Sequence, residues 1–190
     1  MSATRLLVLG VVRMFGRAHG YQVRRELLSW SADKWANVQP GSIYHALKKM
    51  TTEALLEKVK AEPGDAGPDR VAYQLTEDGE QEFQVLMARS LSEPDSGYPQ
   101  LCAAVGLLPA LPRAHAIRLL RRRLVQFETE ERRSTLQLTA NDGGRPHVAE
   151  LFRLWAGIAG AGREWVTALI DRLEAGEYVM AGDPAPGNQI

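Results

Sequence analysis

The chain has 190 residues, 45% of them hydrophobic and 24% charged, and its formal net charge is zero. These values are ordinary for a globular protein of one large or two small domains and exclude a disordered chain. The single cysteine excludes an internal disulfide and fits a reducing compartment. No apolar run approaches the ~20 residues that span a bilayer and no signal peptide is evident, so we expect a cytoplasmic protein outside the membrane.

The charges are not evenly spread along the chain. Residues 1–60 carry ten Lys and Arg against four Asp and Glu, whereas residues 61–100 carry two against nine. Residues 101–190 are nearly balanced, at eleven against ten. Any attraction to phosphate groups therefore belongs to the N-terminal block.

The chain opens with two apolar segments. The dense apolar run over residues 4–15 is too long for an ordinary strand and predicts a buried first helix that ends at Gly16. A turn at residues 18–20 precedes a second helix from Tyr21 to Trp30, and residues 31–38 form a connection.

The next stretch, residues 37–56, predicts a short helix with two different faces. A Pro40-Gly41 turn leads into Ser42 as the N-cap, and apolar residues then recur at helical spacing. The other face carries aromatic, hydrogen-bonding and basic side chains, namely Tyr44, His45, Lys48 and Lys49. This composition suits a DNA groove, although a solvated helix that merely carries two lysines explains the stretch equally well by itself.

The segment after this helix changes its period. Two alternating stretches, residues 57–61 and 71–75, flank a Pro- and Gly-rich loop and predict a hairpin. A further helix begins at Thr76 and ends near Ser92, before a domain boundary signalled by Glu93-Pro94-Asp95-Ser96-Gly97. Helices followed by a hairpin outline a winged helix-turn-helix, in which the short basic helix is the recognition helix.

The second half is helical by pattern. Pro112 can start one long helix, and Pro146 opens another that runs to about Gly176 with a regular apolar stripe. Together they predict an antiparallel hairpin, which cannot bury both apolar stripes alone, so we expect a homodimer. The expected fold is mainly α: a winged helix domain with a two-stranded wing (1–92), a helical dimerisation domain (98–180) and a disordered tail (181–190).

Three motifs occur in an order that resembles the PadR family of bacterial transcriptional regulators. They are an apolar helix followed by His19-Gly20-Tyr21, the run Pro40-Gly41-Ser42-Ile43-Tyr44-His45-Ala46-Leu47, and the wing Gly67-Pro68-Asp69-Arg70-Val71-Ala72-Tyr73-Gln74-Leu75-Thr76-Glu77-Asp78-Gly79. The resemblance covers residues 4–92 and extends more weakly to the helical second half. It implies a sequence-specific DNA-binding regulator, by default a repressor, that acts as a homodimer on a double-stranded operator.

The resemblance also assigns roles to residues. The expected DNA-binding residues are Tyr21, Gln39, Ser42, Tyr44, His45, Lys48, Lys49 and Arg70. Two departures from the family pattern matter: Asp69 and Val71 replace Pro and Lys in the wing and are expected to weaken its contact with DNA. Ala54 stands where relatives carry Gly, and a positive φ there costs an alanine about 1 kcal/mol.

A run of small residues at 156–162 lies between two tryptophans in the last long helix. The run indicates either another helix that crosses closely or a cavity for a flat apolar ligand. The cavity would be walled by Phe152, Trp155 and Trp165. Relatives are often released from DNA by aromatic compounds, so the resemblance implies a small aromatic effector.

Other chemistry is poorly supported by the sequence. Cys102 and His115 are not held together by any motif, and the four histidines show no metal-ligand spacing. We therefore expect neither an enzyme nor a metal site nor a cofactor. The alternative function is a winged-helix protein-interaction module whose Arg-rich segment 118–133 contacts an acidic partner, although a solvated face paired with nearby glutamates explains these arginines too.

Overall fold

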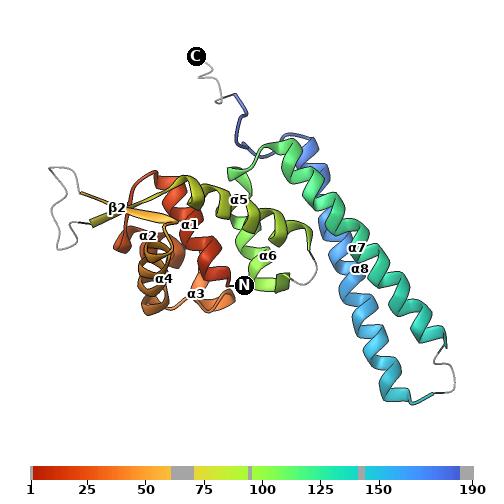
Figure 1. The fold of residues 1–190 in the computed structure, drawn as a ribbon. Coiled ribbons are helices and arrows are strands. Elements are labelled where there is room, and N and C mark those ends of the chain that lie inside the picture. Colours follow the sequence, from red (N-terminus) through yellow and green to blue (C-terminus); the bar gives the residue numbers. More distant parts are fainter. Residues whose placement is uncertain (1, 61–70, 94–95, 141–143, 185–190) are drawn as a thin grey trace. The chain divides into compact units, whose positions relative to one another are not determined.

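The computed structural model of the chain describes residues 2–60, 71–93, 96–140 and 144–184 (Figure 1). Contacts divide it into two compact units. The first comprises Met1–Ser90 with Asp95–Ala110, and the second comprises Leu91–Pro94 with Leu111–Ile190. Within the described residues, no helix is both long and apolar enough to cross a membrane.

The first unit is helical with one small sheet, as expected for a winged helix-turn-helix. Its elements are α1 (Ala3–Phe15), β1 (Ala18–His19), α2 (Gly20–Ser29), α3 (Ala32–Trp35), α4 (Pro40–Thr52), β2 (Leu56–Lys60), β3 (Val71–Leu75), α5 (Glu77–Ser92) and α6 (Gly97–Gly106). Helix α1 is the centre of the core, because it is buried without a break from Leu6 to Val12. A helix that is apolar on all sides is stable only when other elements surround it.

The sheet has three antiparallel strands in the order β1-β3-β2. Strands β2 and β3 form the expected hairpin, with Lys58 opposite Tyr73. The expected turn at residues 18–20 is wrong at its first two positions, because Ala18 and His19 pair with β3 on its other edge. A two-residue strand carries no periodic signal, so only its distant partner reveals it. The expected wing loop, residues 63–68, lies outside the described residues.

Helix α4 begins earlier than the sequence suggested. Gln39 is its N-cap and Pro40 occupies the first turn, where the missing N–H of proline costs nothing. The expected cap, Ser42, lies inside this turn and its hydroxyl donates to the Gln39 carbonyl oxygen at 2.7 Å. Pro40 and Gly41 are therefore the start of the recognition helix rather than a turn before it.

The junction from α4 to β2 is a left-handed turn. Ala54 has φ +58°, while the N–H groups of Ala54 and Leu55 donate to the carbonyls of Thr51 and Met50. These two bonds form a Schellman motif, in which the left-handed position is normally a glycine. Gly79 of α5 packs on the same turn, since a Cβ added there would lie 2.0 Å from the Leu55 carbonyl oxygen.

Helix α6 belongs with the first unit, although the second domain was expected to begin at residue 98. Its Ala103 and Ala104 are fully buried. Beyond its end, the Leu107 side chain occupies the space beside Gly10 of α1, where an added Cβ would lie 2.4 Å from it. The short 3₁₀ helix η2 (Leu108–Ala110) then leads to the second unit.

The second unit is the predicted antiparallel hairpin of α7 (Arg113–Ala140) and α8 (Pro146–Glu174) (Figure 1). Two ion pairs fix its direction, because Arg121 of α7 contacts Glu174 at 2.7 Å and Glu131 contacts Arg163 at 2.8 Å. Partners therefore run in opposite order along the two helices. The connection at residues 141–143 lies outside the described residues.

The sequence suggested that Arg123 is exposed like the other arginines of segment 118–133, but the structure shows that it is not. It is buried, its Nε donates to the Leu91 carbonyl oxygen at 3.1 Å, and its guanidinium lies 5.8 Å from the centre of the Phe127 ring. Burial lowers the pKa of Arg123 despite the attraction of Glu93. The carbonyl and the ring offset part of the cost of burying this charge.

The segment after α8 is tied to the start of α7. Arg113 donates to the carbonyls of Leu173 and Tyr178 and pairs with Asp183 at 2.5 Å. Ala181 forms an isolated parallel β-bridge with Pro112. The expected disorder of residues 181–190 is therefore wrong for 181–184, and residues 185–190 lie outside the described residues.

Candidate nucleic-acid interface

Helix α4 presents a polar face opposite a buried apolar one. Ile43, Leu47 and Met50 are buried against the first unit. The opposite side of the helix is exposed at Gly41, Tyr44, His45, Lys48, Lys49 and Thr52. Their exposure follows from the helical spacing of the buried residues, and they include four of the predicted DNA-binding residues, Tyr44, His45, Lys48 and Lys49.

Tyr44 has a second role that its sequence position does not show. It is 43% exposed, and the edge of its ring lies against Gly20 of α2, where an added Cβ would be 2.6 Å from the ring. The glycine of the His19-Gly20-Tyr21 motif therefore allows α4 to approach α2 closely. Tyr44 is held by this contact while part of the ring remains accessible.

The His19-Gly20-Tyr21 motif also joins α2 to the wing. The buried His19 side chain donates from Nδ1 to the carbonyl oxygen of Val71 in β3, at 3.0 Å. Tyr21 stacks on the His19 ring at a centroid distance of 5.6 Å and remains 47% exposed. Tyr21 thus lies close to the wing strand as well as on α2.

Two predicted DNA-binding residues at the start of α4, Gln39 and Ser42, are joined by a hydrogen bond. Gln39 is exposed, and its amide donates to the Asn37 side chain at 3.5 Å. Ser42 is half-buried, and its hydroxyl hydrogen is used by the Gln39 carbonyl. Ser42 can therefore offer its oxygen only as an acceptor while that bond persists.

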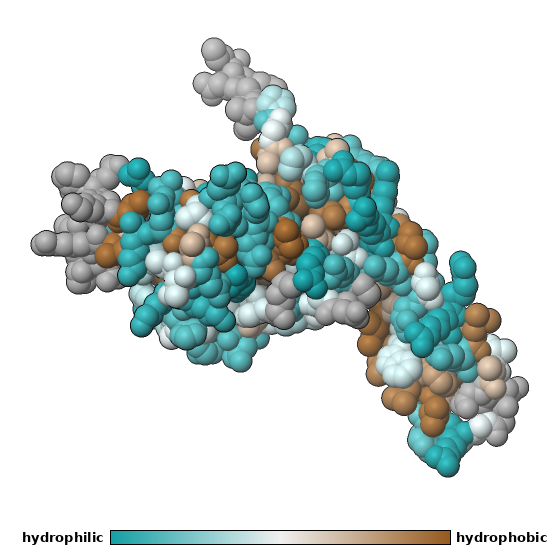
Figure 2. Space-filling model, viewed as in Figure 1, coloured by the Kyte–Doolittle hydropathy of each residue, from teal (hydrophilic) through white to brown (hydrophobic). Residues whose placement is uncertain are grey.

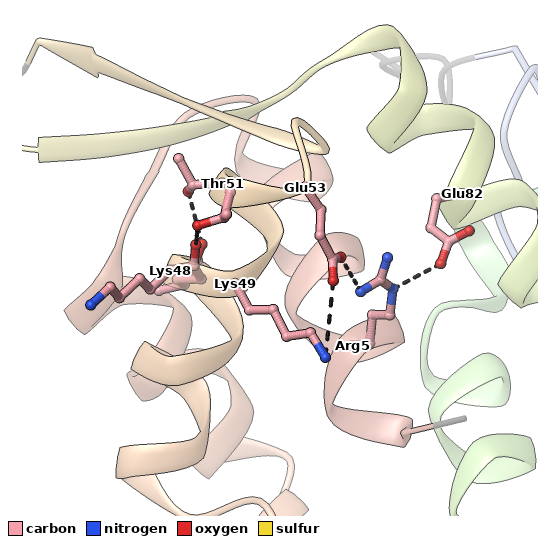
Figure 3. A network of polar contacts seen from close by, with 8 residues as sticks. Arg5, Lys48, Lys49, Thr51, Glu53 and Glu82 are labelled. Carbon is pink, nitrogen blue, oxygen red and sulfur yellow. Dashed lines mark hydrogen bonds and ion pairs between the residues drawn. The ribbon is translucent and has the colours of Figure 1, made fainter.

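The two lysines of α4 differ in their surroundings, as Figure 3 shows. Lys49 Nζ lies 3.9 Å from the Glu53 carboxylate, one helical turn further on, whereas Lys48 points away from this group. Within the described residues, the side-chain amine of Lys48 has no hydrogen-bond or ion-pair partner. Lys48 is therefore the lysine that is free to meet a phosphate.

Glu53 is the centre of a network that joins three helices (Figure 3). Arg5 of α1 contacts Glu53 at 2.5 Å and Glu82 of α5 at 2.8 Å. Burial disfavours the charge of Arg5, but hydrogen bonds to Glu53 and Glu82 outweigh it and raise the pKa of Arg5. Glu53 thus offsets the charge of Lys49 at the C-terminal end of α4, whereas Lys48 keeps its charge uncompensated within the described residues. Only the Lys49–Glu53 spacing could have been recognised in the sequence.

Only part of the wing belongs to the described residues. The predicted residue Arg70 and its neighbour Asp69 lie outside the described residues. Val71 is 39% exposed at the start of β3. Within the described residues, no three His, Cys, Asp or Glu side chains gather into a possible metal site.

The residues predicted to bind a ligand are only partly together. Phe152 and Trp155 contact each other edge to face, with ring centroids 5.7 Å apart. Trp165 lies ten residues beyond Trp155, roughly 15 Å along the helix axis. The glycines differ too: the Phe127 ring fills the space beside Gly162, whereas nothing lies within 4 Å of a Cβ added at Gly157. Close helix crossing thus explains Gly162 but not Gly157.

Comparison with known proteins gives a family match and several structural neighbours. Residues 8–85 match the model of the Transcriptional regulator PadR-like family. This range runs from α1 into α5 and includes the whole of α4 and the described wing strands. No curated protein matches the chain.

The structural neighbours are distant in sequence. PadR of Bacillus subtilis, solved in complex with operator DNA, is 17% identical with a TM-score of 0.40, and the match covers 89% of this chain and 98% of that one. The same regulator in complex with p-coumaric acid is 18% identical with a TM-score of 0.40, covering 90% and 99%. The PadR-like regulator BC1756 of Bacillus cereus is 18% identical with a TM-score of 0.38, covering 91% and 99%.

Proposed function

We propose that this chain, whose residues 8–85 match the model of the PadR-like family of transcriptional regulators, represses transcription as a homodimer that binds double-stranded operator DNA in a sequence-specific manner. The observation that carries the proposal is the exposed face of α4. It combines a partly accessible tyrosine, a histidine and a lysine without a partner among the described residues, on a helix whose other face is fixed in the core. Family members are regulators rather than enzymes, so we propose no catalytic activity.

In this proposal, the N-terminal part of α4 enters the major groove. Tyr44 and His45 contact base edges, and Ser42 accepts a hydrogen bond at the groove. Lys48 contacts a phosphate, with Gln39 and Lys49 at the border of the interface. Tyr21 supports the helix from α2, and Arg70 reaches the DNA from the wing. A homodimer presents two such helices to half-sites about one helical turn, ~34 Å, apart.

The proposed repressor is released by a small aromatic ligand that binds near Phe152, Trp155 and Trp165. A ligand that prefers a dimer with misspaced recognition helices shifts the population away from the DNA-competent state. The edge-to-face contact of Phe152 and Trp155 supports an aromatic site at this part of α8. Because Trp165 lies further along the helix, a site that includes all three side chains needs residues from two copies.

The second candidate is a protein-interaction module. It is favoured by the exposed arginines of α7, since Arg118, Arg122 and Arg132 have no carboxylate partner within the described residues. An acidic protein surface would bind there. DNA binding instead requires α4, so the two candidates use different residues.

Selection of bound duplexes from a random pool by the purified protein tests the proposal. We expect one enriched two-fold symmetric sequence, whose binding weakens linearly with the logarithm of the salt concentration. Replacement of Lys48 and Lys49 by alanine is expected to abolish this binding, whereas replacement of Arg121 and Arg122 leaves it in place. Enrichment of no sequence, or loss only in the α7 variant, would favour the protein-interaction module.

A further inference from the structure

Helix α8 has a second apolar face that the described part of its own chain does not cover. Ala159, Val166 and Leu173 are buried against α7. A separate group of large side chains remains exposed: Leu151 at 46%, Leu154 at 56%, Trp155 at 43%, Ile158 at 59% and Trp165 at 37%. Figure 2 shows apolar surface along the hairpin of α7 and α8. Isolated exposed apolar residues are common, but a continuous helical face of this kind marks an interface.

The positions on this face are symmetric about Ile158. Leu151 and Trp165 lie seven residues on either side of it, and Trp155 and the exposed Ala161 lie three residues on either side. Leu154 lies four residues before it. Offsets of three, four and seven residues fall on one helical face. The face is therefore compatible with a two-fold axis that passes beside Ile158.

The side-chain sizes favour an antiparallel arrangement around that axis. In an antiparallel pair of α8 helices, Trp155 meets the exposed Ala161 of the second copy, so a large side chain faces a small one. A parallel pair would place Trp155 against Trp155 and leave the small residues facing each other. Interdigitation of large and small side chains gives denser packing.

Area and charge agree with a second copy as the occupant. At ~100 Å² for each half-exposed large side chain, five of them offer on the order of 500 Å² per copy, so two copies bury about 1,000 Å², the lower limit for a specific interface. The antiparallel arrangement also places Arg153 within one residue of Glu164 of the second copy. Arg153 already contacts Glu150, so it would lie between two carboxylates.

We infer that the homodimer is held by two antiparallel α8 helices that cross on a two-fold axis at Ile158. This inference rests on the dimer of the proposed function and specifies its geometry. It also explains Gly157: among the described residues no atom lies within 4 Å of a Cβ added there, although glycine weakens a helix. Because Gly157 has no side chain and lies on the exposed flank of α8, it lets the backbones of the two copies approach each other.

Cysteine cross-linking of the full chain tests this geometry. The only native cysteine, Cys102, is first replaced by serine. Ile158→Cys then places two thiols at the axis, where Cα atoms within ~7 Å can form a disulfide. Leu151→Cys is the matched control, because its two copies lie fourteen residues, roughly 21 Å, apart along the helices. Mild oxidation is expected to convert most of the Ile158→Cys protein, and little of the Leu151→Cys protein, to a covalent dimer.

The other outcomes are equally informative. Cross-linking of both variants would mean a parallel pair, and cross-linking of neither in a protein that sediments as a dimer would place the interface on another face. Both results overturn the inference but leave the proposed function intact. Sedimentation of the Cys102→Ser protein as a monomer overturns the inference and the proposed dimer together. Binding of both variants to the selected duplex is measured separately, so that a loss of DNA binding can be distinguished from an error in the dimer geometry.

Discussion

Ala54 shows how one residue can depart from a pattern and still be accommodated. The sequence raised the question of a positive φ at Ala54, and the structure has one, at φ +58°. The turn keeps both Schellman hydrogen bonds, and its Ala54 carbonyl accepts a further bond from Thr76 Oγ1 at 2.7 Å. The surrounding structure therefore holds the alanine in a conformation that is unfavourable for its Cβ.

Ala54→Gly is expected to stabilise the first unit. Removal of the Cβ relieves the left-handed strain, and part of this gain is lost to the greater freedom of glycine in the unfolded chain, which leaves about 0.5–1 kcal/mol. Urea unfolding followed by circular dichroism measures the change. Gly79→Ala at the same junction should have the opposite sign, because its Cβ would lie 2.0 Å from the Leu55 carbonyl oxygen. A destabilised Ala54→Gly protein would contradict this account.

At the scale of elements, α4 has an electrically uneven surface. Its Lys48 is unpaired within the described part of the chain, whereas Lys49 shares Glu53 with Arg5. The exposed Lys49–Glu53 pair itself is weak, of the order expected for surface pairs, ~0.3–0.5 kcal/mol. Its main effect is to keep a carboxylate beside the amine, which opposes the approach of a phosphate.

We expect Lys48→Ala to lower the salt slope of operator binding by about one and Lys49→Ala to lower it less. The slope is obtained from fluorescence anisotropy titrations at several salt concentrations. In a Glu53→Gln background, Lys49→Ala should recover the full effect, because the competing carboxylate is gone. Glu82→Gln is the control, since it removes a partner of Arg5 without touching Lys49. Equal slopes for both lysine variants in the native background would contradict the role given to Glu53.

How far the sequence predicts these elements depends on where their partners lie. Periodic apolar residues predict α4 and its exposed face, because the buried side is defined within one helix. The strand β1 is not predictable in this way, since Ala18 and His19 gain their structure from β3. The burial of Arg123 is missed for the same reason, because the carbonyl of Leu91 that accepts its hydrogen bond is 32 residues away.

At the scale of the whole molecule, a ligand site on α8 would be a site of the dimer. We expect planar aromatic compounds to change the tryptophan fluorescence and to weaken operator binding over the same concentration range. Trp155→Leu is expected to remove the binding effect, whereas Trp35→Phe, in the first unit, should leave it. Fluorescence and DNA binding that both stay constant across a panel of such compounds would end the effector proposal.

The pairing of β1 with β3 has a consequence for synthesis of the chain on the ribosome. Ala18 can pair in the sheet only after its partner Tyr73 has been synthesised, so the first unit cannot complete its fold before then. At ~5–20 residues per second, the 55 residues that follow Ala18 up to and including Tyr73 take roughly 3–11 s to add. Throughout this interval the nascent helices α1 to α4 lack the strand that His19 binds, so the domain becomes competent to fold only after the whole wing has emerged.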